Sequence, residues 1–139
     1  MPQTVRDVMT PHPITVQAST VVADAACAMR DAGVGDVIVV EGTRLYGIVT
    51  DRDIVVRAVA ERRDAESARI GDICSENLAC VAPSDSVEDA ARMMSESAVR
   101  RLPVIEGGEL VGIVALGDLA VERDRRSVLG HISAAVPNR

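Results

Sequence analysis

The sequence predicts an α+β fold of two layers, written as two β-α-β-β-α repeats related by pseudo-two-fold symmetry. Residues 5–56 align with residues 70–121 without a gap, at a constant offset of 65. Each copy carries one helical apolar stripe and two apolar runs of strand length. Hydrophobic residues make up 47% of the 139 residues, yet Tyr46 is the only aromatic one. A core of aliphatic side chains suits helices that pack on short buried strands.

The duplication is supported by identical residues at matching positions, and chance does not keep one register over so many of them. Identical pairs include Asp7/Asp72, Val16/Val81, Asp24/Asp89, Met29/Met94, Gly47/Gly112 and Asp53/Asp118.

Each copy opens with a short extended segment, residues 14–16 in the first and 79–81 in the second. A cluster of Ser, Thr and Asp follows, which is suited to capping a helix. The helix then carries apolar residues at the spacing i, i+4, i+7, which makes one stripe. These residues are Val22, Ala26 and Met29 in the first copy and Val87, Ala91 and Met94 in the second.

Two strands come next in each copy, joined by four residues that contain Gly, and this pattern is typical of a β-hairpin. The strands are expected at 37–40 and 45–49 in the first copy, and at 102–105 and 110–114 in the second. A second helix is expected to begin near Asp51 and, in the second copy, near Leu116.

We divide the chain into residues 1–66, the first repeat with a linker helix, and residues 67–139, the second repeat with a C-terminal helix. Residues 61–69 are charged and Ala-rich, which indicates a solvated helix end or a linker. Residues 122–135 are suited to extending the last helix. One copy has too little surface to be stable alone, so we expect the two to pack face to face.

The composition excludes several classes of partner. With 15 Lys and Arg against 21 Asp and Glu, the formal net charge is −6. An acidic chain weighs against nucleic acid and anionic membranes, since both need a basic surface. No apolar run approaches the roughly 18 residues of a membrane span, and no secretory signal is visible. The three cysteines are an odd, sparse set that fits a reducing cytoplasm.

Neither a metal site nor a catalytic set is indicated. Cys74 and Cys80 lie close in sequence, but His12 and His131 are far apart, and a metal needs more ligands nearby. We expect buried or loop thiols, with Cys27 packing as a small hydrophobe and a redox role left open. No Ser/His/Asp set or acid pair appears, so we predict no enzymatic activity and no required cofactor.

The strongest candidate site is residues 47–53, Gly-Ile-Val-Thr-Asp-Arg-Asp, where a predicted buried strand leads into a helix. Free backbone N–H groups and the helix dipole favour an anion there, and Thr50 can cap the helix or bond a phosphate. The Asp53 carboxylate offers two acceptor oxygens for the two hydroxyls of a ribose. The alternative is structural: Thr50 and Asp51 cap the helix, while Asp53 complements its dipole. The residues alone favour neither interpretation.

The gap-free duplication together with two motifs resembles a tandem pair of CBS domains, a Bateman module, over almost the whole chain. Residues 47–53 are similar to the nucleotide signature of that family, and residues 99–105, Val-Arg-Arg-Leu-Pro-Val-Ile, resemble its second-strand motif. The resemblance implies a module with two clefts that often dimerises. It also implies binding of adenosine-containing ligands to regulate a partner.

The resemblance implies one complete site. In relatives with bound nucleotides, the Thr and Asp of one copy hold ribose and phosphate, and basic residues of the other copy reach the same phosphates. The corresponding residues are Thr50 and Asp53, with Asp51 beside them, combined with Arg100 and Arg101. A plainer interpretation of the two arginines is that they are solvated charges or partners of nearby Asp.

The corresponding second site is weakened in this sequence. It would combine Ala115 and Asp118 with Gly35 and Asp36. Ala115 lacks the hydroxyl of Thr50, and Asp36 is an acid at the position of the basic Arg101. A phosphate facing Asp36 would meet like-charge repulsion. We therefore predict one competent nucleotide site and one weak or vacant site.

The family's adenine pocket is apolar and uses backbone groups near the first strand of each copy. The matching residues here are Thr15, Val16, Cys80 and Val81. The resemblance thus predicts a cytoplasmic regulatory module that binds AMP, ADP, ATP or another adenosine-containing molecule in the cleft between its two motifs. It would form a homodimer and signal to an effector protein in trans by a population shift. The alternative is a protein-interaction or structural CBS module with no physiological nucleotide ligand.

Overall fold

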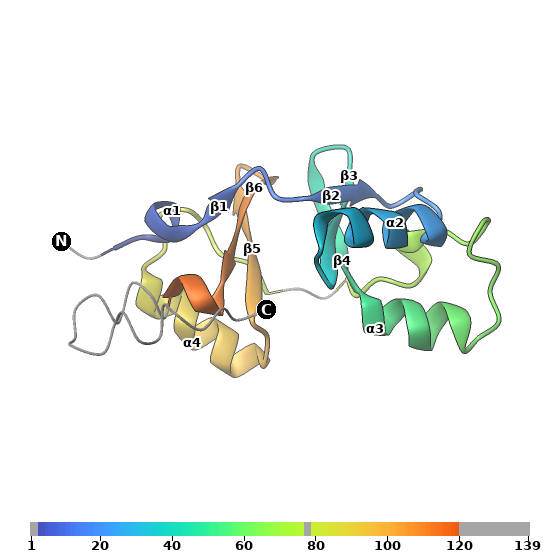
Figure 1. Ribbon diagram of the computed structural model, residues 1–139. Helices are drawn as coiled ribbons and strands as arrows, with labels where there is room; N and C mark the ends of the chain where they lie inside the picture. The colour runs from blue at the N-terminus through green and yellow to red at the C-terminus, as the bar shows by residue number, and fades with distance from the viewer. Residues whose placement is uncertain (1–2, 77–78, 120–139) are drawn as a thin grey trace. The chain divides into compact units, whose positions relative to one another are not determined.

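Two three-stranded sheets, each the base of a separate unit, organise the chain, and the computed structural model describes residues 3–76 and 79–119 (Figure 1). We call Ile14–Leu78 the first unit, and Met1–Pro13 together with Ala79–Arg139 the second unit. The predicted α+β class, with mixed helices and small sheets, is confirmed. The predicted helix extension over residues 122–135 lies outside the described residues.

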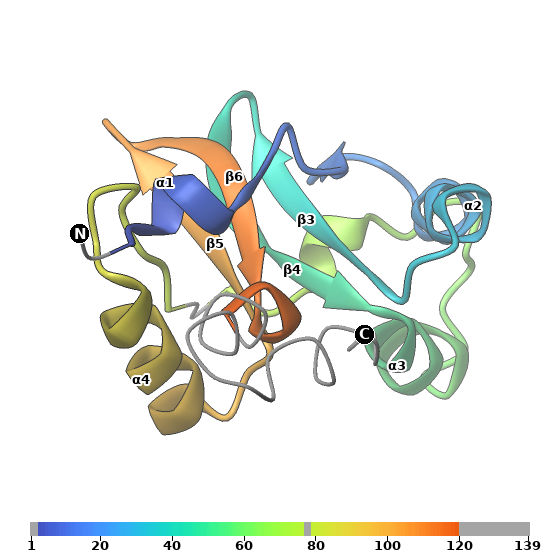
Figure 2. The same ribbon diagram turned by 60° about the vertical axis from the view of Figure 1, so that its left-hand side comes forward.

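The first unit contains the sheet β2-β3-β4, formed by β2 (Thr15–Gln17), β3 (Asp36–Glu41) and β4 (Arg44–Thr50). β2 runs parallel to β3, while β3 and β4 form the predicted antiparallel hairpin, drawn in turquoise in Figure 2. The two hairpin strands extend one residue beyond their predicted ends because backbone pairing continues past the apolar run, whereas β2 lies one residue later than the predicted segment 14–16. The hairpin turn places Gly42 at φ 68°, a backbone conformation that glycine adopts at little steric cost.

The helix α2 (Val22–Ala32) covers this sheet and buries Val22, Ala25 and Met29. The stripe therefore uses the i+3 position, and Ala26, which was expected in it, is only half-buried. Both i+3 and i+4 lie on the same face of a helix, so the spacing alone does not choose between them. The helix ends at Gly33, which adopts the left-handed conformation at the cap.

The second unit contains the sheet β1-β6-β5, formed by β1 (Thr10–Pro11), β5 (Arg101–Glu106) and β6 (Glu109–Ala115). Its helix α4 (Val87–Ser97) buries Val87, Ala90 and Met94, so Ala90 replaces the predicted Ala91. The strand predicted at 79–81 is reduced to a single parallel bridge between Val81 and Val104.

Each unit is completed by a segment that leads into the other copy. The helix α1 (Val5–Val8) packs in the core of the second unit, and the short helix η2 (Ile70–Asp72) packs in the core of the first. Val5 and Ile70, which match at the offset of 65, are both fully buried. The backbone N–H of Val5 donates to Asp85 at 2.8 Å and that of Ile70 to Thr20 at 2.7 Å, at matching positions.

Residues 61–69 contribute to the first unit and are not merely a solvated linker. Ala65 and Ala68 pack against its core. Their carbonyl oxygens accept hydrogen bonds from the backbone N–H groups of Ala23 and Val22, each at 2.9 Å. Because these amides lie in the first turn of α2 and have no partner within the helix, the segment caps the helix from outside.

The second helices of both copies begin where the sequence predicts, at Asp51 and at residue 116. In the first unit, α3 (Asp51–Asp53) continues without a break into η1 (Ile54–Val59), where the N–H of Ala60 donates to Val55 five residues earlier. This wide turn is a π-helix. Within the described part of the chain, no helix is long and apolar enough to span a membrane.

Candidate functional site

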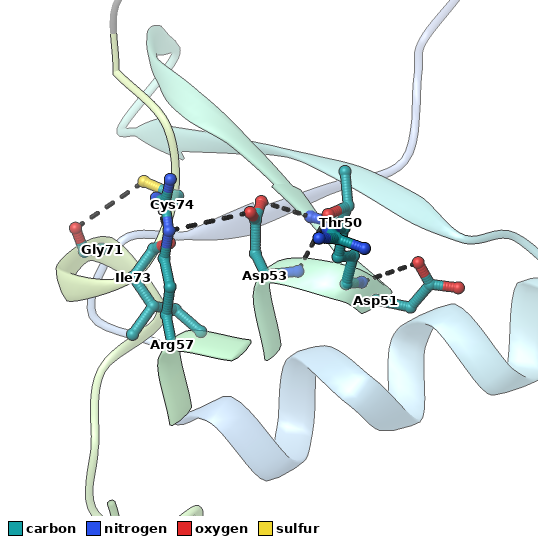
Figure 3. A network of polar contacts seen from close by, with 8 residues as sticks. Thr50, Asp51, Asp53, Arg57, Gly71, Ile73 and Cys74 are labelled. Carbon is teal, nitrogen blue, oxygen red and sulfur yellow. Dashed lines mark hydrogen bonds and ion pairs between the residues drawn. The ribbon is translucent and has the colours of Figure 1, made fainter. Parts of the chain in front are cut away.

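The candidate site is the junction of β4 and α3, where Thr50 and Asp53 form a capping box (Figure 3). The hydroxyl oxygen of Thr50 accepts a hydrogen bond from the N–H of Asp53 at 3.0 Å. The carboxylate oxygen Oδ2 of Asp53 accepts one from the N–H of Thr50, also at 3.0 Å. The capping interpretation is therefore realised in the structure. The hydroxyl proton of Thr50 and the second oxygen of Asp53 keep hydrogen-bonding capacity beyond this box.

The first-turn amides of α3 are already satisfied within the first unit. The N–H of Asp51 donates to the Gly35 carbonyl at 2.9 Å, and the N–H of Arg52 to the Asp51 carboxylate at 2.8 Å. The N–H of Asp53 is bonded to Thr50. The expectation of free N–H groups for an anion is therefore wrong for this structure, because a backbone carbonyl and two side chains satisfy them. Any phosphate contact has to come from other groups.

The residue Arg57, which the sequence analysis did not single out, lies beside Asp53. Its Nε is 3.9 Å from Oδ1 of Asp53, and its Nη1 donates to the Ile73 carbonyl at 3.0 Å. The Asp53 side chain is 17% exposed and that of Arg57 49%. The signal that could have found this contact is the i, i+4 spacing of an acid and a base on one helix.

Gly35 and Asp36 lie next to the motif in the first unit. Asp36 pairs with Thr50 across the sheet, and a Cβ added at Gly35 would lie 3.2 Å from Oδ2 of Asp51. A side chain at position 35 would therefore need the Asp51 carboxylate to shift.

The second unit repeats part of this arrangement. The N–H of Ala115 donates to Oδ2 of Asp118 at 2.9 Å, but alanine has no hydroxyl to return the bond. Arg101 pairs with Ala115 across the sheet, and the Arg100 carbonyl accepts from the N–H of Leu116 at 2.7 Å. Thus Thr50, Asp51 and Asp53 belong to the first unit, and Asp118, Arg100 and Arg101 to the second.

The residues expected at an adenine pocket lie at the start of each copy. Thr15 is exposed and Val16 half-buried on β2, where they pair with Ile38 and Val39. In the second unit, Cys80 is exposed and Val81 is buried. Each pair thus presents one accessible and one packed side chain.

The three cysteines differ in exposure: Cys74 is buried, Cys27 is half-buried and Cys80 is exposed. Burial raises the pKa of the Cys74 thiol, and the negative charge of Glu76 adds to the effect. Tyr46 also has a raised pKa, chiefly because of Glu76. Among residues 3–76 and 79–119, no three His, Cys, Asp or Glu side chains gather where they could hold a metal ion.

A family model described as the CBS domain matches residues 5–59 and 70–124. The chain therefore belongs to the CBS domain family and carries two copies in tandem, as the sequence predicts. Proteins built from CBS domains alone are generally regulatory rather than catalytic.

Individual relatives agree with this assignment. The CBS domain-containing protein YhcV of Bacillus subtilis is 41% identical over 119 residues, covering 86% of this chain and 84% of that protein. The crystal structure of Hypoxic Response Protein I, with two coordinated zinc ions, is 34% identical with a TM-score of 0.79, covering 85% and 97% of the two chains. The crystal structure of CBSX2 in complex with AMP is 29% identical with a TM-score of 0.77, covering 89% and 98%.

Proposed function

We propose that the chain is a regulatory module that binds an adenosine-containing nucleotide and reports its presence to a partner protein in trans. The observation that carries the proposal is the half-buried Asp53 carboxylate at the start of the helix, with Thr50 beside it. The similarity to CBSX2, which was crystallised in complex with AMP, supports an adenosine ligand.

The local chemistry suits the sugar end of a nucleotide better than its phosphates. A ribose presents two hydroxyl donors, and the Asp53 carboxylate is an acceptor with capacity left on Oδ1. The first-turn amides of α3 already have partners. The family resemblance implies Arg100 and Arg101 as the phosphate contacts, and guanidinium groups bind phosphate well.

A second candidate function is protein interaction without a nucleotide. Its supporting observation is a row of exposed apolar side chains on η1, where Val55, Val56 and Val59 are 58%, 47% and 64% exposed. An exposed apolar patch of this kind favours association with another protein surface. The proposed regulatory module would also form a homodimer and signal to an effector protein in trans. Its cytoplasmic localisation remains an expectation.

Isothermal titration with AMP, ADP and ATP tests the proposal. We expect one ligand per chain, since Ala115 and Asp36 weaken the second site. Asp53→Asn should weaken binding about tenfold, because it removes a charged acceptor from the ribose hydroxyls. The matched variant Asp118→Asn changes the equivalent capping carboxylate of the second unit and should leave the affinity unchanged.

Two equivalent sites, or full binding by Asp53→Asn, would contradict the proposed site. A thermal-shift series with the same nucleotides separates the two candidate functions, since a ligand that binds only the folded state raises its melting temperature. No shift with any of the three would favour the protein-interaction module.

A further inference from the structure

Arg57 bridges the candidate site to a different part of the first unit (Figure 3). Its guanidinium has Nε facing Oδ1 of Asp53 and Nη1 bonded to the Ile73 carbonyl. An i, i+4 ion pair on an open helix surface contributes little, because solvent screens the charges and the side chains lose freedom. Here the acid is only 17% exposed and the base has a second, fixed partner.

That second partner is fixed because the segment around it is held on both sides. Ile73 is 1% exposed and belongs to the core of the first unit. Two residues later, Ser75 exchanges two backbone hydrogen bonds with Ile48 of β4, at 2.9 and 3.0 Å. The approach is close, since a Cβ added at Gly47 would lie 2.4 Å from the Ser75 carbonyl oxygen. The guanidinium is therefore anchored to a rigid carbonyl.

The Asp53 carboxylate consequently has a hydrogen bond at one oxygen and a longer ion-pair contact, 3.9 Å from Nε of Arg57, at the other. Oδ2 accepts from the N–H of Thr50, and Oδ1 faces Arg57. A carboxylate oriented by one hydrogen bond and one ion pair presents its remaining lone pairs in preferred directions, which favours a ligand with two hydroxyl donors at fixed spacing. We propose that Arg57 is a positioning residue for Asp53 and sets the preference of the site for a ribose over a 2′-deoxyribose. This inference rests on the proposed nucleotide-binding function.

The sequence of the second copy lacks this device. At the offset of 65, Asp53 matches Asp118, whereas Arg57 matches Glu122. Both units keep the hydrogen bond from a backbone N–H to Oδ2 of the aspartate. The distance is 3.0 Å from Thr50 to Asp53 and 2.9 Å from Ala115 to Asp118. Arg57, four residues after Asp53, thus occurs only in the copy that also has Thr50.

The test compares the affinities of the full chain for AMP and 2′-deoxy-AMP by titration calorimetry. We expect wild type to prefer AMP about tenfold, the effect of one hydrogen bond to a charged acceptor. Arg57→Met should reduce this preference to about threefold or less, and Arg57→Lys should recover part of it. In an Asp53→Asn background, Arg57→Met should cause no further change, because its effect acts through that carboxylate.

Arg52→Met is the matched control, since it removes an exposed arginine of the same helix and the same charge. It should change the affinities for both ligands by one common factor and leave their ratio as in wild type. If Arg57→Met weakens both ligands equally, Arg57 is merely structural or acts at long range, and the inference is overturned. If wild type binds neither ligand, the proposed function fails, and the inference falls with it. The two failures are therefore distinguishable.

Discussion

At the scale of single residues, a pair of matched glycines, one in each unit, allows close packing inside that unit. A Cβ added at Gly47 would lie 2.9 Å from Sγ of Cys74, and one added at Gly112 would lie 2.8 Å from Sδ of Met9. Met9 and Cys74 match at the same offset as the glycines. In each unit, therefore, a sulfur-containing side chain lies over a strand glycine: Cys74 over Gly47 in the first unit and Met9 over Gly112 in the second.

The buried thiol of Cys74 predicts a specific dependence of stability on pH. Its pKa is raised by burial in the folded state, whereas in the unfolded chain a thiol has a pKa of about 8.5. As pH rises through that region, the unfolded state loses a proton that the folded state keeps, so wild type loses stability. Cys74→Ala should cost about 1 kcal/mol at neutral pH. This cost should shrink when urea unfolding is repeated at about pH 10.

The control for this prediction is Val49→Ala, which removes buried atoms from the same core without removing a titrating group. Its cost relative to wild type should stay the same at both values of pH. If the cost of Cys74→Ala is also constant, the thiol does not titrate between the folded and unfolded states as argued.

At the scale of secondary-structure elements, the complete capping box of the first unit and the half-formed one of the second predict a stabilising substitution. Asp118 already accepts a hydrogen bond from the N–H of Ala115, but position 115 has no hydroxyl oxygen to accept the reciprocal bond from the N–H of Asp118. Ala115→Thr should complete the box found at Thr50 and raise the free energy of unfolding by about 0.5–2 kcal/mol. Chemical denaturation measures the gain. Ala115→Val has nearly the shape of threonine without its hydroxyl, so an equal gain from it would contradict the capping explanation.

The helices and hairpins were predictable from sequence because their signals are local. Apolar spacing indicated the helix α2, and the apolar runs around the Gly42 turn located β3 and β4 to within about a residue. The extended segment expected at 79–81 forms only one bridge, at Val81, and not a full strand. Pairing depends on a partner strand, which a three-residue apolar run does not specify.

The candidate site was predictable in its residues but not in its contacts. The motif at residues 47–53 marked Thr50 and Asp53, and the structure brings them together. Sequence alone could not show that the helix amides are satisfied by Gly35 and neighbouring side chains. It also could not show that Arg57 reaches the Ile73 carbonyl, because a bond across 16 residues depends on tertiary packing.

At the scale of the whole molecule, the two units differ because α1 completes the core of the second unit and η2 completes the core of the first. The first unit is continuous in sequence, Ile14–Leu78, and contains the η2 helix that completes its own core. The second unit is discontinuous, because α1 and β1 precede the first unit in the chain. Its fully buried Val5 comes from that distant segment.

This difference predicts how fragments of the chain behave. A fragment of residues 14–78 adds to the first copy the η2 segment that completes its core, so unlike a single copy it should fold alone and unfold cooperatively in urea. Its stability should be low because small domains bury a limited fraction of their surface. A fragment of residues 79–139 should remain largely unfolded, because β6 lacks its partner β1 and the core lacks Val5. Adding a peptide of residues 1–13 should restore structure in a concentration-dependent way, measured by circular dichroism.

A Val5→Ala peptide is the matched control for this complementation. Val5 is fully buried among Leu102, Val104 and Val114 in the core of the second unit. Truncating it removes about two methylene equivalents from the core, so a considerably higher peptide concentration should be needed. If residues 79–139 fold without the peptide, or if both peptides act equally, the segment of residues 1–13 is not what completes this core. The two copies would then be independent repeats joined in one chain, and α1 would only cover a core that already folds without it.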